Sequence, residues 1–274
     1  MCQWCVEHGE GKKWYLNTRN YINKELFDSR EEIRTAADMF FRDSERMFGI
    51  DMKKGFPLLD KPVIGKIVGR SVRKTIEKRE RGQVIPVEEA KSILDNANMA
   101  ALVSCVCRKS QLGFTKAKFC LPFTYLADYG KEWPDSSKGG INYISIEEAK
   151  DAVESAAHRG YVISVYGFPV PFVGGLCMCE YPSCMALKSR LDYGMDYIIR
   201  KSEFVVNHDI DKCIGCGKCV GKCQFRAILL SRTLGKALFN MKKCFGCGVC
   251  KHACDQNANN LIPRQEVQAV REEW

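Results

Sequence analysis

Two compact blocks of cysteine near the C-terminus constrain this chain more than any other feature. Each has the spacing C-x2-C-x2-C-x3-C, at Cys213, Cys216, Cys219 and Cys223 and again at Cys244, Cys247, Cys250 and Cys254. A tight loop with two residues between cysteines directs three thiolates toward three corners of one iron–sulfur cube. Zinc ribbons use two C-x2-C pairs with a longer gap between them, so this spacing favours iron–sulfur clusters over zinc.

The fourth cysteine of each block lies too far along the chain to close the same loop. We therefore predict that it reaches the other cube, so that the ligands cross. Cluster one is then held by Cys213, Cys216, Cys219 and Cys254, and cluster two by Cys244, Cys247, Cys250 and Cys223. Glycines between these cysteines let backbone amides approach the sulfurs, at Gly215, Gly217, Gly246 and Gly248. Apolar residues are expected to cover the cubes, namely Ile214, Val220, Phe245 and Val249.

On these eight cysteines, residues 204–263 resemble the bacterial two-cluster ferredoxins. The resemblance implies two [4Fe–4S] clusters and single-electron transfer at low potential. One departure concerns the residue after the fourth cysteine, which is usually proline in the family and is here Gln224 or Asp255. That difference affects the local turn and the reduction potential, but not the ligation.

The other eight of the 16 cysteines lie upstream of these blocks. Cys2-x2-Cys5-x2-His8 is metal-like, and zinc, a further iron–sulfur cluster and unligated thiols are all open there. Two C-x-C pairs, each followed by a lone cysteine, are predicted to bind metal, with buried free thiols as the alternative: Cys105, Cys107 and Cys120, then Cys177, Cys179 and Cys184. We expect one or two further iron–sulfur clusters, or a zinc site, from this upstream set.

Residues 86–107 and 145–166 align without a gap and suggest an internal repeat. Each copy predicts a helix of about 14 residues followed by a β-rich run. Ser145 and Glu148 fit a capping box at the start of the second helix. The alternative is that the shared Glu-Glu-Ala-Lys is simply a common helix start. The C-x-C pair after each copy favours the repeat.

Residues 14–82 are predicted to be helical. Thr18 is placed to cap a helix through Phe27, and Ser29 is placed to cap the next. The second helix has an apolar face of Ile33, Ala36, Ala37, Phe40 and Phe41. A third segment, Lys61 to Arg81, is strongly basic. It is either a solvated helix face or a docking face for an acidic partner.

The expected fold class is α+β. We divide the chain into a helical N-terminal region at 1–85, an α/β region with the two helix–strand–C-x-C repeats at 86–203, and the two-cluster domain at 204–274. The uncharged stretch at 160–179 contains Pro169 and Pro171, so we interpret it as a buried strand and a cluster-lining loop rather than a membrane span.

Composition narrows the function classes. The chain has 274 residues, 46% apolar and 27% charged, as in globular proteins of roughly two domains. Its first residues do not form a signal peptide, so we expect a cytoplasmic protein whose cysteines bind metal rather than form disulfides. Each cluster with four thiolates adds about −2, so two clusters reduce the formal charge of +9 to about +5 and four reduce it to about +1. This weakens the case for nucleic acid.

The opening C-x2-C-x2-H-G-x-G-K-K-W-Y and the C-x-C-R ending at Arg108 resemble a poorly characterised set of iron–sulfur proteins of anaerobes. That resemblance implies electron transfer in anaerobic energy metabolism. Phosphate-cradling motifs are missing, so any nicotinamide or flavin is expected on a partner. We predict a low-potential electron carrier, or a non-catalytic subunit of an oxidoreductase complex whose redox partner contains flavin or metal. The alternatives are a reductase that binds substrate at an extra cluster near Arg108, and a zinc-bearing interaction protein.

Overall fold

The computed structural model describes residues 13–42, 57–61, 82–114, 116–136, 139–196 and 198–273. Helices and antiparallel sheets are mixed, with a helical N-terminal segment, so the α+β fold class is confirmed. Cys2, Cys5 and His8 lie outside the described residues, as does all of the basic segment except Lys61.

The N-terminal segment begins with two short 3-10 turns, Trp14–Leu16 and Thr18–Asn20, followed by α2 (Lys24–Ser29) and α3 (Glu31–Phe41). The expected helix from Thr18 is wrong, because Ile22 is extended and its amide donates to the Val173 carbonyl at 3.1 Å. The cap of α2 is instead Asn23, whose side chain accepts from the Leu26 amide at 2.8 Å.

The predicted start of the second helix is also displaced. Ser29 is the last residue of α2, and the N-cap of α3 is Arg30, which makes no side-chain capping bond. The N-cap of α3 is therefore one residue later than the predicted Ser29. The apolar face is as predicted: Ala36 is half-buried, and four residues are buried, namely Ile33, Ala37, Phe40 and Phe41.

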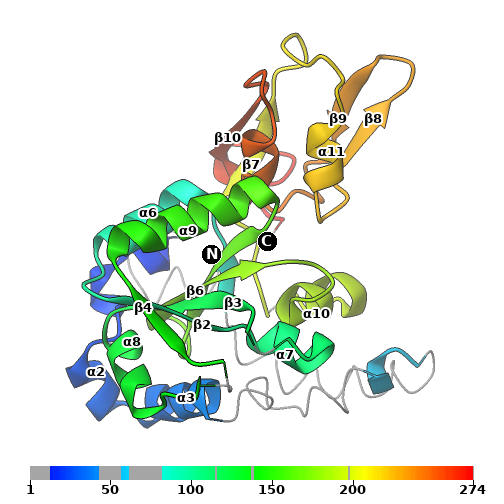
Figure 1. The fold of residues 1–274 in the computed structure, drawn as a ribbon. Helices are drawn as coiled ribbons and strands as arrows, with labels where there is room; N and C mark the ends of the chain where they lie inside the picture. The colour runs from blue at the N-terminus through cyan, green and yellow to red at the C-terminus, as the bar shows by residue number, and fades with distance from the viewer. Residues whose placement is uncertain are drawn as a thin grey trace.

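A six-stranded antiparallel sheet forms the centre of the molecule (Figure 1). Its order is β1-β5-β6-β3-β2-β4. The strands are β1 (Gly82–Val84), β2 (Ala100–Ser104), β3 (Lys118–Pro122), β4 (Ile141–Ile144), β5 (Val162–Gly167) and β6 (Val173–Cys179). The two predicted repeats are interleaved, since β1 precedes α6 but pairs with β5, and β4 precedes α9 but pairs with β2.

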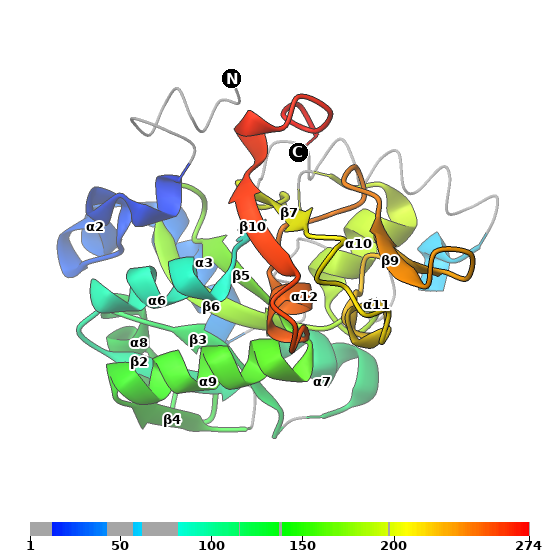
Figure 2. The ribbon, with the colours of Figure 1, turned by 90° about the horizontal axis from the view of Figure 1, so that it is seen from above.

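Helices α6 (Val87–Asp95) and α9 (Ile146–Arg159) lie side by side over one face of the sheet (Figure 2). The capping box of Ser145 and Glu148 is confirmed. Helix α9 has the expected 14 residues, but α6 has only 9. It ends early because the Asn96 side chain donates to the Ser92 carbonyl at 2.8 Å and its backbone closes the last turn.

The uncharged stretch at 160–179 forms a hairpin of two strands, β5 and β6, with Pro169 and Pro171 in its turn. The expectation of one strand followed by a loop is therefore wrong, and Cys177 and Cys179 lie on β6. Helix α7 (Val106–Leu112) begins within the first C-x-C pair and contains Cys107, whereas α10 (Met185–Tyr193) begins after Cys184. Helix α8 (Tyr125–Tyr129) follows β3. In the described part of the chain, no helix is both long and apolar enough to span a bilayer.

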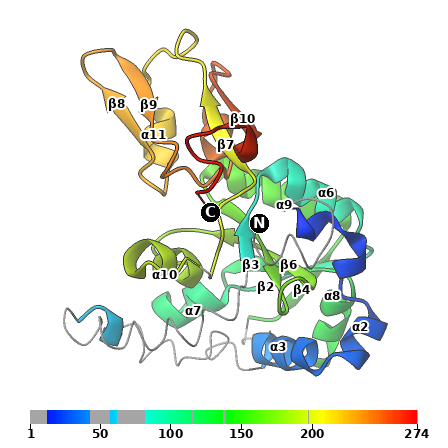
Figure 3. The ribbon, with the colours of Figure 1, turned by 180° about the vertical axis from the view of Figure 1, so that it is seen from behind.

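The C-terminal segment stands above one end of this sheet (Figure 3). Strands β7 (Phe204–His208) and β10 (Asn259–Pro263) pair, and β8 (Ile228–Ser231) forms a hairpin with β9 (Lys236–Phe239). Two short helices carry cysteines, α11 (Lys218–Lys222) and α12 (Val249–His252), and α12 packs against α9. One hydrophobic cluster extends from α3 and α10 into this segment and includes Phe225 and Phe245.

Candidate iron–sulfur sites

Four thiols line a cavity in the C-terminal segment. They are Cys213, Cys216 and Cys219 of the first block and Cys254 of the second, and the cavity floor includes Ala237 and Ala258. The loop reaches this shape through two glycines with positive φ, which bring the start of α11 over the cavity. This donor set of four soft thiols fits a [4Fe–4S] cluster. The arrangement supports the crossed ligation proposed for cluster one.

The other four cysteines form a second, more enclosed set. The pKa of Cys247 is raised to about 12, chiefly by burial, and the nearby Cys244 and Cys223 thiols contribute to that shift. Burial likewise raises the pKa of Cys250, and Cys247, Cys244 and Cys223 add to the shift. Cys223 of the first block therefore lies among the thiols of the second, as crossed ligation requires. A bound cluster would have to displace the protons that these thiols retain.

Backbone amides point at the sulfurs of both sets. The amide of Ala237 donates to Cys213 Sγ at 3.5 Å, and that of Ala258 to Cys254 Sγ at 3.4 Å. In the second set the Gly246 amide donates to Cys244 Sγ at 3.4 Å. Such donors stabilise a more negative, reduced cluster. The sequence indicated this role only for the glycines. Ala237 lies on β9, far along the chain from Cys213, whereas Ala258 follows Cys254 closely and precedes β10.

The apolar cover is uneven. Phe245 and Val249 are buried as expected, and the Phe245 ring stacks on Phe225 with centroids 3.9 Å apart. Ile214 does not keep water away, because 65% of it is exposed. It lies in the loop at the open side of the cavity, next to the exposed Cys216. The first set therefore faces solvent, whereas the second faces the core.

Gln224, which replaces the usual proline, joins the C-terminal segment to the central sheet. Its side-chain oxygen accepts from the Tyr181 amide at 2.7 Å, and its nitrogen donates to the Gly160 carbonyl at 2.6 Å and the Cys179 carbonyl at 3.5 Å. The only sequence signal for this role was the missing proline. Asp255, at the equivalent position, forms an exposed ion pair with Lys218.

The six described upstream cysteines converge on one place, and we call them the six-thiol group: Cys105, Cys107, Cys120, Cys177, Cys179 and Cys184. None of the described cysteines forms a disulfide. Across the described ranges, no three or more His, Cys, Asp or Glu side chains are arranged to hold a metal ion. The first C-terminal set is included, because its four thiols line a cavity and do not meet at one point.

Hydrogen bonds connect these thiols to one another. Those from Cys107 and Cys120 hold the pKa of Cys105 well below its usual value, despite burial. Those from Cys107 and Cys179 similarly lower the pKa of Cys184. Arg108, only 5% exposed, stands beside Cys105 with its Nη1 3.6 Å from the sulfur. These contacts favour thiolates at Cys105 and Cys184. Neighbouring thiols and burial instead hold the pKa of Cys107, Cys120 and Cys179 well above the usual value.

Comparison with known proteins identifies the C-terminal segment only. No curated protein matches the chain, and no solved structure matches it. The model of the 4Fe-4S dicluster domain matches residues 196–259, and this supports an iron–sulfur electron-transfer role. The match includes all eight cysteines of the two blocks and confirms the resemblance to ferredoxins. Residues 196–259 are thus a ferredoxin-type 4Fe-4S dicluster domain.

Proposed function

We propose that this protein carries single electrons through two [4Fe–4S] clusters, each held by three cysteines of one block and the fourth of the other. The observation that carries the proposal is the position of Cys254 around the same cavity as Cys213, Cys216 and Cys219. The neighbourhood of Cys223, Cys244, Cys247 and Cys250 supports the second cluster. A bound [4Fe–4S] cluster supplies one-electron redox chemistry, and the amides directed at the sulfurs hold the negative charge.

The first set is the proposed contact point for a redox protein that contains flavin or metal. Its thiol Cys216 is exposed, and the adjacent Ile214 offers an apolar surface. The neighbouring β8–β9 hairpin adds further exposed apolar side chains, Leu229, Leu230 and Leu234. The second set is covered by the buried side chains of Phe245 and Val249, whereas the exposed Ile214 leaves the first set open to solvent. Electron exchange with a partner is therefore expected at cluster one, in an oxidoreductase complex or as a free carrier.

Upstream, we propose that the six-thiol group holds further iron and sulfide. Its thiols hydrogen bond to one another beside a buried cation, which supports ligation more than simple packing. Cys2 and Cys5 remain proposed metal ligands, for zinc or iron. The anaerobic, cytoplasmic setting remains an expectation from the sequence.

A reductase acting near Arg108 is the weaker candidate. The guanidinium is occupied by the Glu180 carboxylate at 3.1 Å and the Met178 carbonyl at 3.5 Å. It also lies 3.8 Å from the centre of the Phe119 ring. With these partners and little exposure, Arg108 is not positioned to bind a substrate. Its surroundings support a role in holding charge beside Cys105.

Pairs of cysteine variants test the crossed ligation in the full chain. We expect Cys254→Ala combined with Cys213→Ala to lose about four iron, because both remove ligands of one cluster. Cys254→Ala combined with Cys247→Ala should lose about eight, because two clusters are damaged. Iron and sulfide analysis after anaerobic reconstitution measures both. If the second pair loses only about four iron, the ligands do not cross.

A further inference from the structure

The order of strands brings thiols from both halves of the sheet together. Strands β3 and β6 are neighbours, and Cys120 is the register partner of Cys177, with the sulfurs 3.7 Å apart. Cys105 follows β2 and begins α7, whereas Cys184 follows β6 and begins α10. The last β6 residue, Cys179, belongs to the same buried cluster as Cys184. Neither C-x-C pair stands apart from the other.

The contacts form one group rather than two. Arg108 of the first half donates to Cys105 Sγ at 3.6 Å and to the Met178 carbonyl of the second half at 3.5 Å. Gln111 of α7 donates to the Ser183 carbonyl, next to Cys184, at 2.6 Å, and Cys120 Sγ lies 3.7 Å from Cys177 Sγ across the strands. If each C-x-C and its lone cysteine formed a separate centre, contacts within a half would dominate. Here, contacts between the halves join both ends of the group.

The polar surroundings of these sulfurs are unusual for thiols that only fill space. Arg108 is buried beside Cys105, and the Ser164 hydroxyl lies 3.3 Å from Cys179 Sγ. An arginine placed in the interior is costly unless a negative charge balances it. Neutral thiols provide no such charge, but thiolates bound to iron do. The Glu180 partner is about half exposed, so it balances this charge from the surface side only.

The six-thiol group adjoins cluster two. Gln224 follows the cluster-two ligand Cys223, and its side chain reaches the carbonyl of Cys179. One hydrophobic cluster contains buried members of both sets, Cys105 and Cys179 with Cys244. Cluster one has a separate small core around Cys213 and Cys219. An iron–sulfur cluster at the six-thiol group would therefore lie on the inner side of cluster two, away from the exposed cavity of cluster one.

We propose that the six-thiol group is the site of one additional [4Fe–4S] cluster shared by both halves of the sheet. Cys105, Cys107, Cys179 and Cys184 are the ligands, because they lie at the ends of elements where the backbone can spread around a cube. Cys120 and Cys177 are held in contact by paired strand positions, so they stay as thiols beside the ligated sulfurs. Binding would deprotonate the four ligand thiols, and the bound cluster would supply one-electron redox chemistry beside cluster two.

The proposal rests on the proposed function only for its electron donor, and iron stoichiometry tests it separately. The experiment uses the full chain with Cys2→Ser and Cys5→Ser, reconstituted anaerobically with iron and sulfide. We expect about twelve iron, of which about eight belong to the C-terminal clusters. Cys107→Ser and Cys179→Ser, one in each half, should each reduce the content to about eight. Their combination should also leave about eight, because both remove the same cluster.

Two substitutions are matched controls. Cys177 is half-buried like Cys107, and Cys120 is buried like Cys179. Cys177→Ser and Cys120→Ser should retain about twelve iron. Losses equal to those of the ligand variants would overturn the assignment of four ligands and two free thiols. Separate, additive losses from Cys107→Ser and Cys179→Ser would overturn the shared site.

A measurement on the parent protein does not depend on any variant's folding. Electron paramagnetic resonance of the fully reduced protein should show a third cluster coupled magnetically to cluster two. About eight iron with both C-terminal signals intact, or zinc in place of upstream iron, would overturn the proposal and leave the proposed function standing. In the protein with Cys2→Ser and Cys5→Ser, about sixteen iron would overturn the single additional cluster. Loss of the two C-terminal signals would instead count against the proposed function.

Discussion

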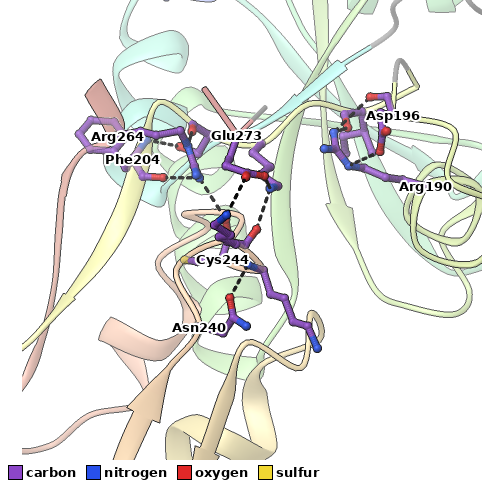
Figure 4. Close-up of polar contacts among 12 residues, drawn as sticks. Arg190, Asp196, Phe204, Asn240, Cys244, Arg264 and Glu273 are labelled. Atoms are coloured by element: carbon purple, nitrogen blue, oxygen red, sulfur yellow. Dashed lines mark hydrogen bonds and ion pairs between the residues drawn. The ribbon is translucent and has the colours of Figure 1, made fainter. Parts of the chain in front are cut away.

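Replacing Arg264 by leucine should destabilise the C-terminal segment by about 3–5 kcal/mol. The residue is fully buried, and its guanidinium donates to three carbonyls, those of Ser202, Phe204 and Cys244, at 2.9, 2.8 and 3.0 Å (Figure 4). Leucine fills part of the volume but leaves these carbonyls without their donor. Since Cys244 begins the second cysteine block, cluster two should be lost at lower denaturant concentrations than in the parent protein.

Anaerobic denaturation followed by the visible absorbance of the clusters measures this effect. Arg271→Leu is the matched control, because Arg271 is an exposed arginine whose ion pair with Glu272 is long, 3.8 Å. It should change stability by less than about 1 kcal/mol. In the Arg264 variant the potential of cluster two should also fall, because a cation beside Cys244 no longer stabilises the reduced state. Equal stability of the two variants would contradict the structural role of Arg264.

The parts that the sequence predicted are those fixed by local spacing. The C-x2-C-x2-C loops, the positive-φ glycines and the Ser145 capping box each depend on residues within one turn of one another. Helix α9 followed its own pattern for the same reason. The α+β class was also accessible, because the helical and β-rich periodicities alternate along the middle of the chain.

Strand order was the missing information elsewhere. Nothing local reveals that Cys120 faces Cys177, since that contact requires β3 and β6 to be neighbours. The repeat alignment even obscured it, because its offset places Ser164 opposite Cys105. The structure instead directs the Ser164 hydroxyl at Cys179 Sγ. The repeated C-x-C pairs are therefore not equivalent positions, although they contribute to one group of thiols.

Tertiary contacts also decided the N-terminal boundaries. Thr18 has the chemistry of a cap, but the backbone near Tyr21 and Ile22 is extended against β6. Helix propensity is too weak to compete with burial of these two side chains. Gln224 shows the same limit, because its partners Gly160 and Tyr181 are distant in sequence. The only sequence signal was that Gln224 stands where the ferredoxins usually have proline.

The second large effect is expected from Gly215→Ala. Gly215 has a φ of +68°, and a Cβ there would fall on the carbonyl oxygen of Gly235, far inside van der Waals contact. Neither atom belongs to a flexible side chain, so the cysteine loop and the β8–β9 turn would have to separate. Combined overpacking and left-handed strain should cost at least about 3 kcal/mol and release cluster one.

Gly217→Ala is the control that separates these two costs. Gly217 lies in the same loop with a φ of +75°, but a Cβ there meets nothing within 4 Å. It should therefore show only the conformational penalty, about 1–2 kcal/mol, and retain both clusters. Iron content and denaturation of the two variants distinguish the cases. Equal losses would mean that the backbone conformation, and not the contact with Gly235, shapes the loop around the first set of thiols.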